Sequence, residues 1–147
     1  MAFTYRKYTP EEVFPFYMKR ALTPEETDKG MTLNEYGNVP TGVDFLDRFA
    51  GLIRQLRWST LEDYAKVTGI DERRLSATIL TLTGRTFNEW IDFYVLLGAY
   101  EMLENTKKKA TEIGKILGFS QLSVFSKFCK NRTKYTPSEL RYRGRFK

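Results

Sequence analysis

The side chains in this sequence that can do chemistry are mainly cations. The 147 residues hold 24 Lys and Arg against 18 Asp and Glu, which leaves a formal net charge of +6. The balance is uneven, because residues 1–42 carry five cations against six anions, or −1, and residues 43–147 therefore carry +7. Clustered guanidinium and ammonium groups attract anions, and the phosphate backbone of DNA is such a partner. The C-terminal part of the chain has the electrostatic character of a DNA-binding domain.

The chain offers little for catalysis or metal binding. It has one cysteine and no histidine, so the usual general base is missing and Cys129 lacks a histidine partner for nucleophilic attack. A structural zinc site needs more thiolate and imidazole ligands than these. The carboxylates Glu62, Asp63 and Glu112 stand at predicted helix starts, and nothing pairs them in a way that indicates acid–base catalysis. We therefore expect no enzymatic activity, no cofactor and no metal site.

The sequence also predicts where the protein works. No apolar run approaches the roughly 20 residues of a membrane-spanning helix. Residues 1–10 lack the apolar core of a signal peptide. A single cysteine cannot form a disulfide within one chain, which suits a reducing compartment. These features favour a cytoplasmic protein that does not contact a membrane.

Residues 112–141 have the pattern of two short helices joined by a tight turn. Apolar residues recur at helical spacing up to Gly118, which stands where a helix end favours a residue that tolerates the left-handed conformation. Ser120 is placed to cap the next helix. The predicted apolar face of that helix consists of Val124, Phe125, Phe128 and Cys129. Residues 136–139, Thr-Pro-Ser-Glu, then begin another helix. This is a helix-turn-helix, whose second helix fits the major groove of DNA.

Residues 43–84 have the same organisation. Apolar residues mark one face of a first helix, Thr60 is placed to cap a second, and Asp71 is placed to cap a third. The segment Ala65–Ile70 aligns with Gly114–Phe119, forty-nine residues later. The chain therefore contains two helix-turn-helix units in tandem.

The residues between the two units predict one long helix at about 87–104, which includes the continuous apolar run Phe93–Leu97. A helix that is apolar all round is buried on more than one side. Residues 1–42 contain two helix starts, Thr9–Glu12 and Thr23–Glu26, followed by a loop rich in Gly, Asn and Pro. We expect this aromatic-rich, partly helical arm to pack over the long helix; a homodimer seam is the alternative.

Tandem helix-turn-helix units joined by a long helix resemble the DNA-binding domain of the AraC/XylS family of bacterial transcription regulators. The residues that carry the resemblance are Glu112-Ile113-Gly114, Gly118-Phe119, Ser123, Phe125-Ser126, Lys130, and Pro137-Ser138 with Arg141. The resemblance implies an all-α fold with units at about 43–84 and 105–143, a linker helix, and an N-terminal arm of residues 1–42. Many family members carry a separate sensor domain, for which 42 residues are too few.

In the family each recognition helix lies in a major groove, so the resemblance implies which positions face DNA here. The implied base-contact candidates are Arg73, Ser76 and Ala77 in the first unit and Leu122, Ser123, Ser126 and Lys127 in the second. A guanidinium can bond both acceptors of guanine, which makes Arg73 the strongest of them. The phosphate-contact candidates are Thr60, Arg74, Lys107, Lys108, Lys109, Lys130, Arg132 and Lys134, with the C-terminal cations Arg141, Arg143, Arg145 and Lys147. For each exposed cation the alternative is a solvated surface role.

Together these features predict a DNA-binding transcription regulator whose two recognition helices enter successive major grooves. The expected partner is double-stranded DNA, with RNA polymerase as a further partner, and a monomer is favoured over a dimer formed through the arm or the linker helix. The alternative is a protein-interaction module of the same fold with weak or no sequence-specific DNA binding. Ala77 and Val95, where relatives often place arginine, favour that alternative, whereas the +7 balance of residues 43–147 disfavours it.

Overall fold

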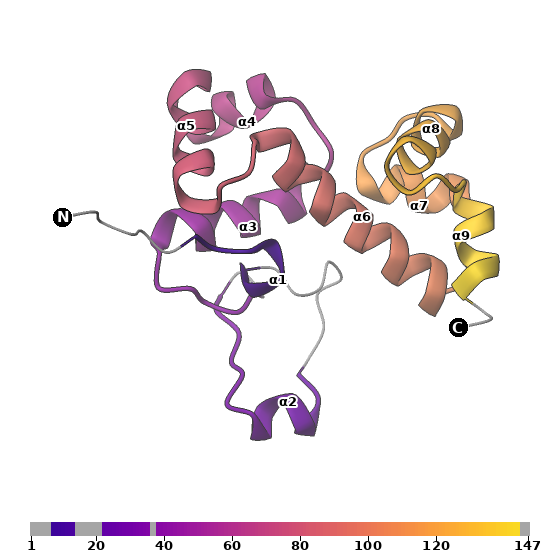
Figure 1. The fold of residues 1–147 in the computed structure, drawn as a ribbon, viewed down its shortest axis with the longest axis horizontal. Coiled ribbons are helices and arrows are strands. Elements are labelled where there is room, and N and C mark those ends of the chain that lie inside the picture. The colour runs from indigo at the N-terminus through magenta and orange to yellow at the C-terminus, as the bar shows by residue number, and fades with distance from the viewer. Residues whose placement is uncertain (1–6, 14–21, 36–37, 145–147) are drawn as a thin grey trace.

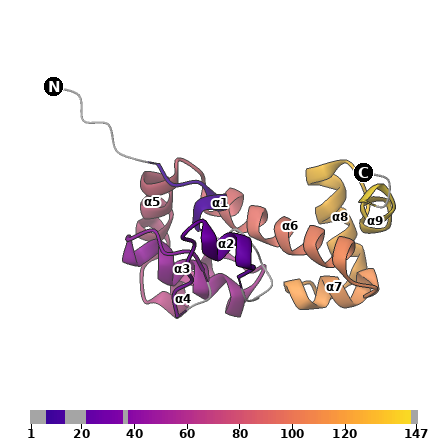
Figure 2. The ribbon, with the colours of Figure 1, turned by 90° about the horizontal axis from the view of Figure 1, so that it is seen from below.

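The computed structural model describes residues 7–13, 22–35 and 38–144, and this part of the chain contains helices and no strand. The expected all-α fold is confirmed. Helices α3, α4 and α5 form one lobe and α7, α8 and α9 form a second, with the long helix α6 running between them (Figures 1 and 2). The helices are α1 (Pro10–Val13), α2 (Pro24–Asp28), α3 (Asp44–Leu56), α4 (Leu61–Thr68), α5 (Glu72–Thr83), α6 (Phe87–Asn105), α7 (Ala110–Leu117), α8 (Leu122–Thr133) and α9 (Pro137–Gly144).

The first lobe is built on the amphipathic helix α3. Leu46, Phe49 and Ile53 are buried on one face of this helix, as their spacing predicted. The Phe49 ring lies against Tyr64 of α4 and Phe87 of α6, at centroid distances of 5.5 and 6.3 Å. Full burial of a large apolar side chain is worth about 1.5–3 kcal/mol. These contacts hold α3 against α4 and the start of α6.

The first helix-turn-helix begins and ends as predicted. Thr60 and Asp71 cap α4 and α5, each accepting the backbone N–H of the residue three positions on, at 3.1 and 2.9 Å. Gly69 and Gly84 end these helices with φ of 73° and 74°. That left-handed conformation costs a residue with a Cβ about 1–2 kcal/mol, so glycine suits both positions.

The turn of the second helix-turn-helix is one residue longer than that of the first. Asp71, two positions after Gly69, is the N-cap of α5, whereas the N-cap of α8 is Gln121, three positions after Gly118. The prediction that Ser120 caps α8 is therefore wrong. Gln121 itself makes no side-chain capping hydrogen bond.

The predicted apolar face of α8 is correct except at one position. Phe125, Phe128 and Cys129 are buried, but Val124 is 39% exposed. At 100° per residue, Val124 lies close to Phe128, four positions on, but about 100° from Phe125. Val124 therefore lies at the edge of the stripe that the other three form, where it is partly exposed.

Helices α5 and α8, the second helices of the two units, are followed by the same hydrogen-bonding motif. Its residues in the two units are fifty positions apart. The hydroxyls of Thr83 and Thr133 donate to the carbonyl four residues back and accept the backbone N–H two residues on. Thr86 and Thr136 then accept a backbone N–H at the starts of α6 and α9, and the glutamate three positions on bonds back to the threonine N–H. These reciprocal bonds are capping boxes. They set how each recognition helix turns into the helix that follows it.

The linker helix α6 is covered from several sides, as its apolar run predicted. Tyr94 and Val95 are fully buried, and Phe93 is half-buried. Helices α1 and α5 contact α6 in the first lobe, and α7 and α9 contact it in the second. The guanidinium of Arg141, on α9, donates to carbonyls at the C-terminal end of α6, including that of Leu103 at 3.1 Å. The apolar run thus finds its partners within the chain.

The described part of the arm attaches to the first lobe. Val13 of α1 is fully buried, and α1 packs against α3 and α6. The backbone N–H of Tyr8 donates to the Leu82 carbonyl at 2.9 Å, beside the end of α5. The segment that carries α2 extends away from both lobes (Figure 1). Most aromatic residues of the arm lie outside the described residues, namely Phe3, Tyr5, Phe14, Phe16, Tyr17 and Tyr36.

Candidate nucleic-acid interface

Helix α5 presents the first set of predicted base contacts to solvent. Because Asp71 caps the helix, Arg73 and Arg74 lie in its first turn, where both are exposed. Ala77, one turn further on, is exposed, and Ser76 is half-buried. The guanidinium of Arg73 is therefore free of the core and can approach a guanine edge, which offers two acceptors in the major groove.

Helix α8 presents the second set with the same pattern of exposure. Ser123 and Lys127 are exposed and Ser126 is half-buried. These three positions lie fifty residues after those of α5, the spacing at which the two helices correspond. Leu122 is 42% exposed at the start of α8 and offers an apolar contact, of the kind a thymine methyl accepts. The two helices therefore present different chemistry at equivalent positions.

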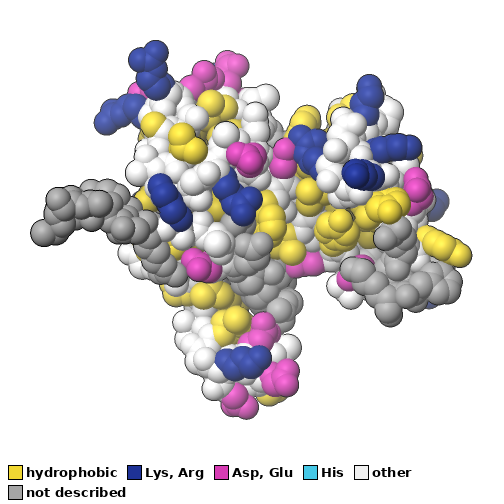
Figure 3. All heavy atoms as spheres, viewed as in Figure 1, with side chains coloured by type: hydrophobic (Ala, Val, Ile, Leu, Met, Phe, Trp, Pro, Cys, Tyr) yellow, Lys and Arg dark blue, Asp and Glu magenta, His cyan; other side chains and the backbone are white. Residues whose placement is uncertain are grey.

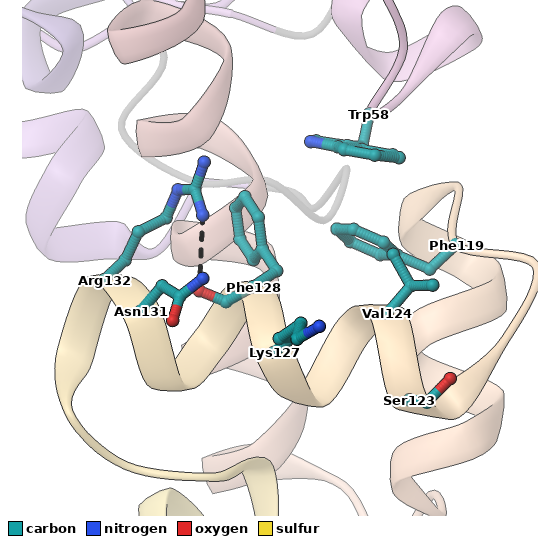
Figure 4. Close-up of a pocket in the computed structure, with 8 residues that line it drawn as sticks. All are labelled: Trp58, Phe119, Ser123, Val124, Lys127, Phe128, Asn131 and Arg132. Atoms are coloured by element: carbon teal, nitrogen blue, oxygen red, sulfur yellow. Dashed lines mark hydrogen bonds between the residues drawn. The ribbon is translucent and has the colours of Figure 1, made fainter.

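A hollow of about 310 Å³ lies beside α8, between this helix and the connection from α3 to α4 (Figure 4). The Trp58 ring forms one wall and stacks on Phe119, with centroids 4.5 Å apart and planes 22° from parallel. Ser123 and Lys127, two base-contact candidates, line the opposite wall. No role was predicted for Trp58 from the sequence. The sequence did contain a signal, because a tryptophan in a short connection between helices usually packs against another part of the protein.

Most of the candidate phosphate contacts are exposed cations that lie near the starts or ends of helices. The exposed ones are Arg74, Lys107, Lys108, Lys109, Lys130 and Lys134. Basic side chains are visible on both lobes in Figure 3. Lys109 is the N-cap of α7 and makes no capping hydrogen bond, whereas Thr60, at the equivalent place, caps α4. The structure leaves these cations accessible to an anion.

Arg132, like Arg141, differs from the other basic candidates because it has a partner inside the protein. Its Nε and Nη2 atoms each lie 2.7 Å from Oδ2 of Asp92, on α6. Its guanidinium also lies 4.0 Å from the centre of the Phe128 ring. Burial raises the pKa of Asp92, while Arg132 acts in the opposite direction. The sequence analysis identified neither this pair nor the bonds from Arg141 to the end of α6, because both join residues at least 35 positions apart.

The described residues supply no other chemical centre. Among them, no group of three or more Asp, Glu or Cys side chains could hold a metal ion. Burial raises the pKa of the Cys129 thiol to about 12, so this cysteine is protonated at neutral pH and a poor nucleophile. No described helix has both the length and the apolar character needed to cross a membrane.

Solved structures share this fold. The C-terminal domain of a two-component response regulator from Fusobacterium nucleatum is 20% identical, with a TM-score of 0.62 over 67% of this chain and 99% of that one. The DNA-binding domain of the transcriptional factor AdpA, solved in complex with a target DNA, is 19% identical, with a TM-score of 0.58 over 66% and 88%. An AraC-type transcriptional regulator from Chromobacterium violaceum is 25% identical, with a TM-score of 0.53 over 63% and 85%.

The sequence comparison agrees with the structural one. No curated protein matches the sequence. A family model described as a helix-turn-helix domain matches residues 64–143, more than half of the chain. That match takes in both recognition helices and the whole of α6. The chain belongs to the AraC-type helix-turn-helix family of DNA-binding transcription regulators.

Proposed function

We propose that this regulator reads DNA through α5 and α8, which enter successive major grooves on one face of the duplex. The observation that carries the proposal is the matched exposure of three positions on each helix, at a constant spacing of fifty residues. A major groove admits one α-helix, and grooves recur once per helical turn. The base contacts we assign are Arg73, Ser76 and Ala77 on α5, with Leu122, Ser123, Ser126 and Lys127 on α8.

The exposed cations around the two helices position the protein without specifying sequence. Arg74, Lys107, Lys108, Lys109, Lys130 and Lys134 take this role, and Arg132 joins them through its exposed side. Thr60, which is neutral, contributes its hydroxyl to the same contacts. Contacts to phosphate fix the register of a protein on the duplex. Each phosphate that is neutralised steepens the fall of affinity with salt by about one unit of log–log slope.

We further propose that the protein acts as a cytoplasmic monomer without enzymatic activity and regulates by recruiting or blocking RNA polymerase. Two unlike reading helices in one chain suit an asymmetric site better than a palindrome. Sedimentation at micromolar protein tests the oligomeric state, and a tight dimer would contradict the proposal.

The test of DNA reading compares two double variants that remove equal charge. Arg73→Ala with Lys127→Ala removes one cation from each reading helix. Arg48→Ala with Lys29→Ala removes two exposed cations that are not assigned to DNA. Duplexes selected by the wild type from a random pool serve as the probe, with fluorescence anisotropy at two salt concentrations as the readout.

We expect the reading-helix variant to lose about 10- to 100-fold or more in affinity for selected duplexes, because a good base contact contributes about 1–3 kcal/mol of discrimination. The control variant should retain most of that affinity. Equal losses in the two variants would mean that charge alone drives binding. A wild type that selects no motif would contradict sequence-specific reading.

A further inference from the structure

A direct contact joins the two lobes without passing through α6. The backbone N–H of Trp58, in the connection between α3 and α4, donates to the Leu117 carbonyl at the end of α7, at 2.9 Å. The Trp58 ring stacks on Phe119 in the turn between α7 and α8, and its edge meets Phe128 of α8 at a centroid distance of 6.3 Å. Figure 4 shows the Trp58 ring lying over Phe119, opposite α8.

Gly118 makes this close approach possible. A Cβ atom at Gly118 would lie 2.8 Å from the carbonyl oxygen and 3.0 Å from the nitrogen of Trp58, distances at which the backbone has to move. Gly69, at the same place in the first helix-turn-helix, has nothing within 4 Å of its Cβ position. Both glycines have positive φ, which favours glycine at each turn. Of the two, Gly118 alone also lies so close to another segment that a Cβ would clash with it.

The connection itself is held in an unusual conformation. Arg57 has φ 61° and ψ −153°, a region that residues with a Cβ seldom occupy. The Tyr64 hydroxyl donates to the Arg57 carbonyl, and the Arg57 guanidinium reaches the Lys115 carbonyl at 3.4 Å. The connection is therefore bonded to α4 of the first lobe on one side and to α7 of the second lobe on the other.

We propose that Trp58 and Gly118 form an interlobe staple, which sets the distance and angle between α5 and α8 and so selects the spacing between the two blocks of a DNA site. A single helix such as α6 leaves two lobes free to twist and bend about it, whereas a second contact away from the helix removes that freedom. The role is one of positioning, because Trp58 acts through the placement of α8. The part that concerns DNA rests on the function proposed above.

The staple can be tested without DNA. Spin labels at Lys66→Cys on α4 and Ser138→Cys on α9 report the distance between the lobes by pulsed electron resonance, and Cys129 can stay because it is buried and protonated. The variants are Trp58→Ala and Gly118→Ala, with Trp58→Phe and Gly69→Ala as matched controls. We expect one narrow distance distribution in the wild type and both controls, and a clearly broadened or shifted one in the two staple variants. A narrow, unshifted distribution in either folded staple variant would overturn the staple.

The consequence for specificity is tested by selection from a random pool of 40-base-pair duplexes. The wild type and the two controls should enrich two blocks at one separation. Trp58→Ala should enrich the same blocks at several separations, with a loss of at least fivefold in preference for the wild-type spacing. One fixed separation in Trp58→Ala would overturn the specificity role. If the wild type enriches no blocks, the proposed DNA reading fails, while the distance measurement still decides whether the staple exists.

Gly118→Ala protects the test against a misfolded Trp58→Ala variant. Gly69→Ala introduces the same kind of backbone strain without a clash with another segment. A folded Gly118→Ala protein whose distance between the lobes equals that of Gly69→Ala would therefore also overturn the proposal. Circular dichroism and the position of tryptophan emission, which comes from Trp90 alone in the Trp58 variants, verify that each variant is folded.

Discussion

Lys134 holds a conformation that its side chain disfavours. It ends α8 with φ 72°, at the position where Gly84 ends α5 with φ 74°. This conformation costs a residue with a Cβ about 1–2 kcal/mol relative to glycine. Glycine loses more conformational entropy on folding, which offsets about 0.5–1 kcal/mol of that difference. The second unit therefore keeps a strained cation where the first has a relaxed glycine, which is consistent with a role for the ammonium at the surface.

Replacing this lysine should stabilise the fold. We expect Lys134→Gly to raise the free energy of unfolding by about 0.5–1 kcal/mol, measured by urea denaturation. Gly84→Ala, the matched control, should lower it by about 1 kcal/mol. A Lys134→Gly protein no more stable than the wild type would show that the lysine side chain contributes an interaction that offsets its backbone cost.

Replacing Asp92 and replacing Arg132 should change the stability of the protein by different amounts. Burial raises the pKa of Asp92 above its ordinary value of 3.8 despite the nearby guanidinium, so ionisation of this carboxyl is harder in the folded state. Asp92→Asn keeps an acceptor for Arg132 and removes the buried charge, and it should lie within about 1 kcal/mol of the wild type at pH 7. Arg132→Leu leaves the carboxylate without its partner and should cost about 1–3 kcal/mol.

The pH dependence of that pair has a definite sign. Because the folded state holds the Asp92 proton more tightly than the unfolded state, this residue contributes stability below pH 3.8 and loses it as pH rises through the folded pKa. The stability of the wild type minus that of Asp92→Asn should therefore fall between pH 3.5 and 7, as followed by urea unfolding at each pH. A difference that grows with pH would contradict this account.

At the scale of helices, the two units differ most at the caps of their first helices. Thr60 caps α4, whereas Lys109, the N-cap of α7, makes no capping bond and places a cation at the positive end of a helix dipole. This arrangement is poor for helix stability. It is favourable for binding a phosphate at the same end of the helix.

Replacing Lys109 with a capping residue should raise the stability of the protein and weaken the salt dependence of its DNA binding. We expect Lys109→Thr to stabilise the protein by about 0.5–2 kcal/mol, because its hydroxyl can accept the backbone N–H of Glu112. If Lys109 binds phosphate, the same change should make the salt dependence of DNA binding shallower by about one unit of slope. Thermal unfolding and anisotropy measure the two effects; an unchanged salt slope would remove Lys109 from the phosphate contacts.

At the scale of the whole molecule, the arm and both lobes share one connected set of buried side chains. Val13 from α1 belongs to it, together with Trp90 of α6 and Phe125 of α8. Elements that bury a common core tend to unfold together. The described part of the arm is therefore expected to stabilise the lobes, in addition to any contact that it makes elsewhere.

Shortening one arm side chain tests this cooperativity. We expect Val13→Ala to lower the free energy of unfolding by about 1–3 kcal/mol, in a single transition seen alike by tryptophan fluorescence and circular dichroism. Val67→Ala is the matched control, since Val67 is 56% exposed and should change stability by less than about 0.5 kcal/mol. Two separate transitions in Val13→Ala would show that the arm and the lobes are independent.

The sequence by itself determined the helices, most of their ends and the tandem organisation. Caps such as Thr60 and Asp71 and ends such as Gly69 and Gly118 depend on bonds within a few residues, so the local sequence contains the information. The same holds for the buried face of α3 and for the family to which the chain belongs. Which side chains touch bases or phosphates remains a prediction from the resemblance.

Only the tertiary structure decided how the two units meet. Local sequence favoured Ser120 as the cap of α8, but the observed cap is Gln121, and the neighbouring Phe119 stacks on Trp58 of the first lobe. The partners Asp92 and Arg132 lie forty positions apart, and Trp58 and Leu117 nearly sixty. Periodicity reports which face of a helix is buried but not what covers it. The relative placement of α5 and α8 follows from contacts between segments whose proximity exists only once the chain has folded.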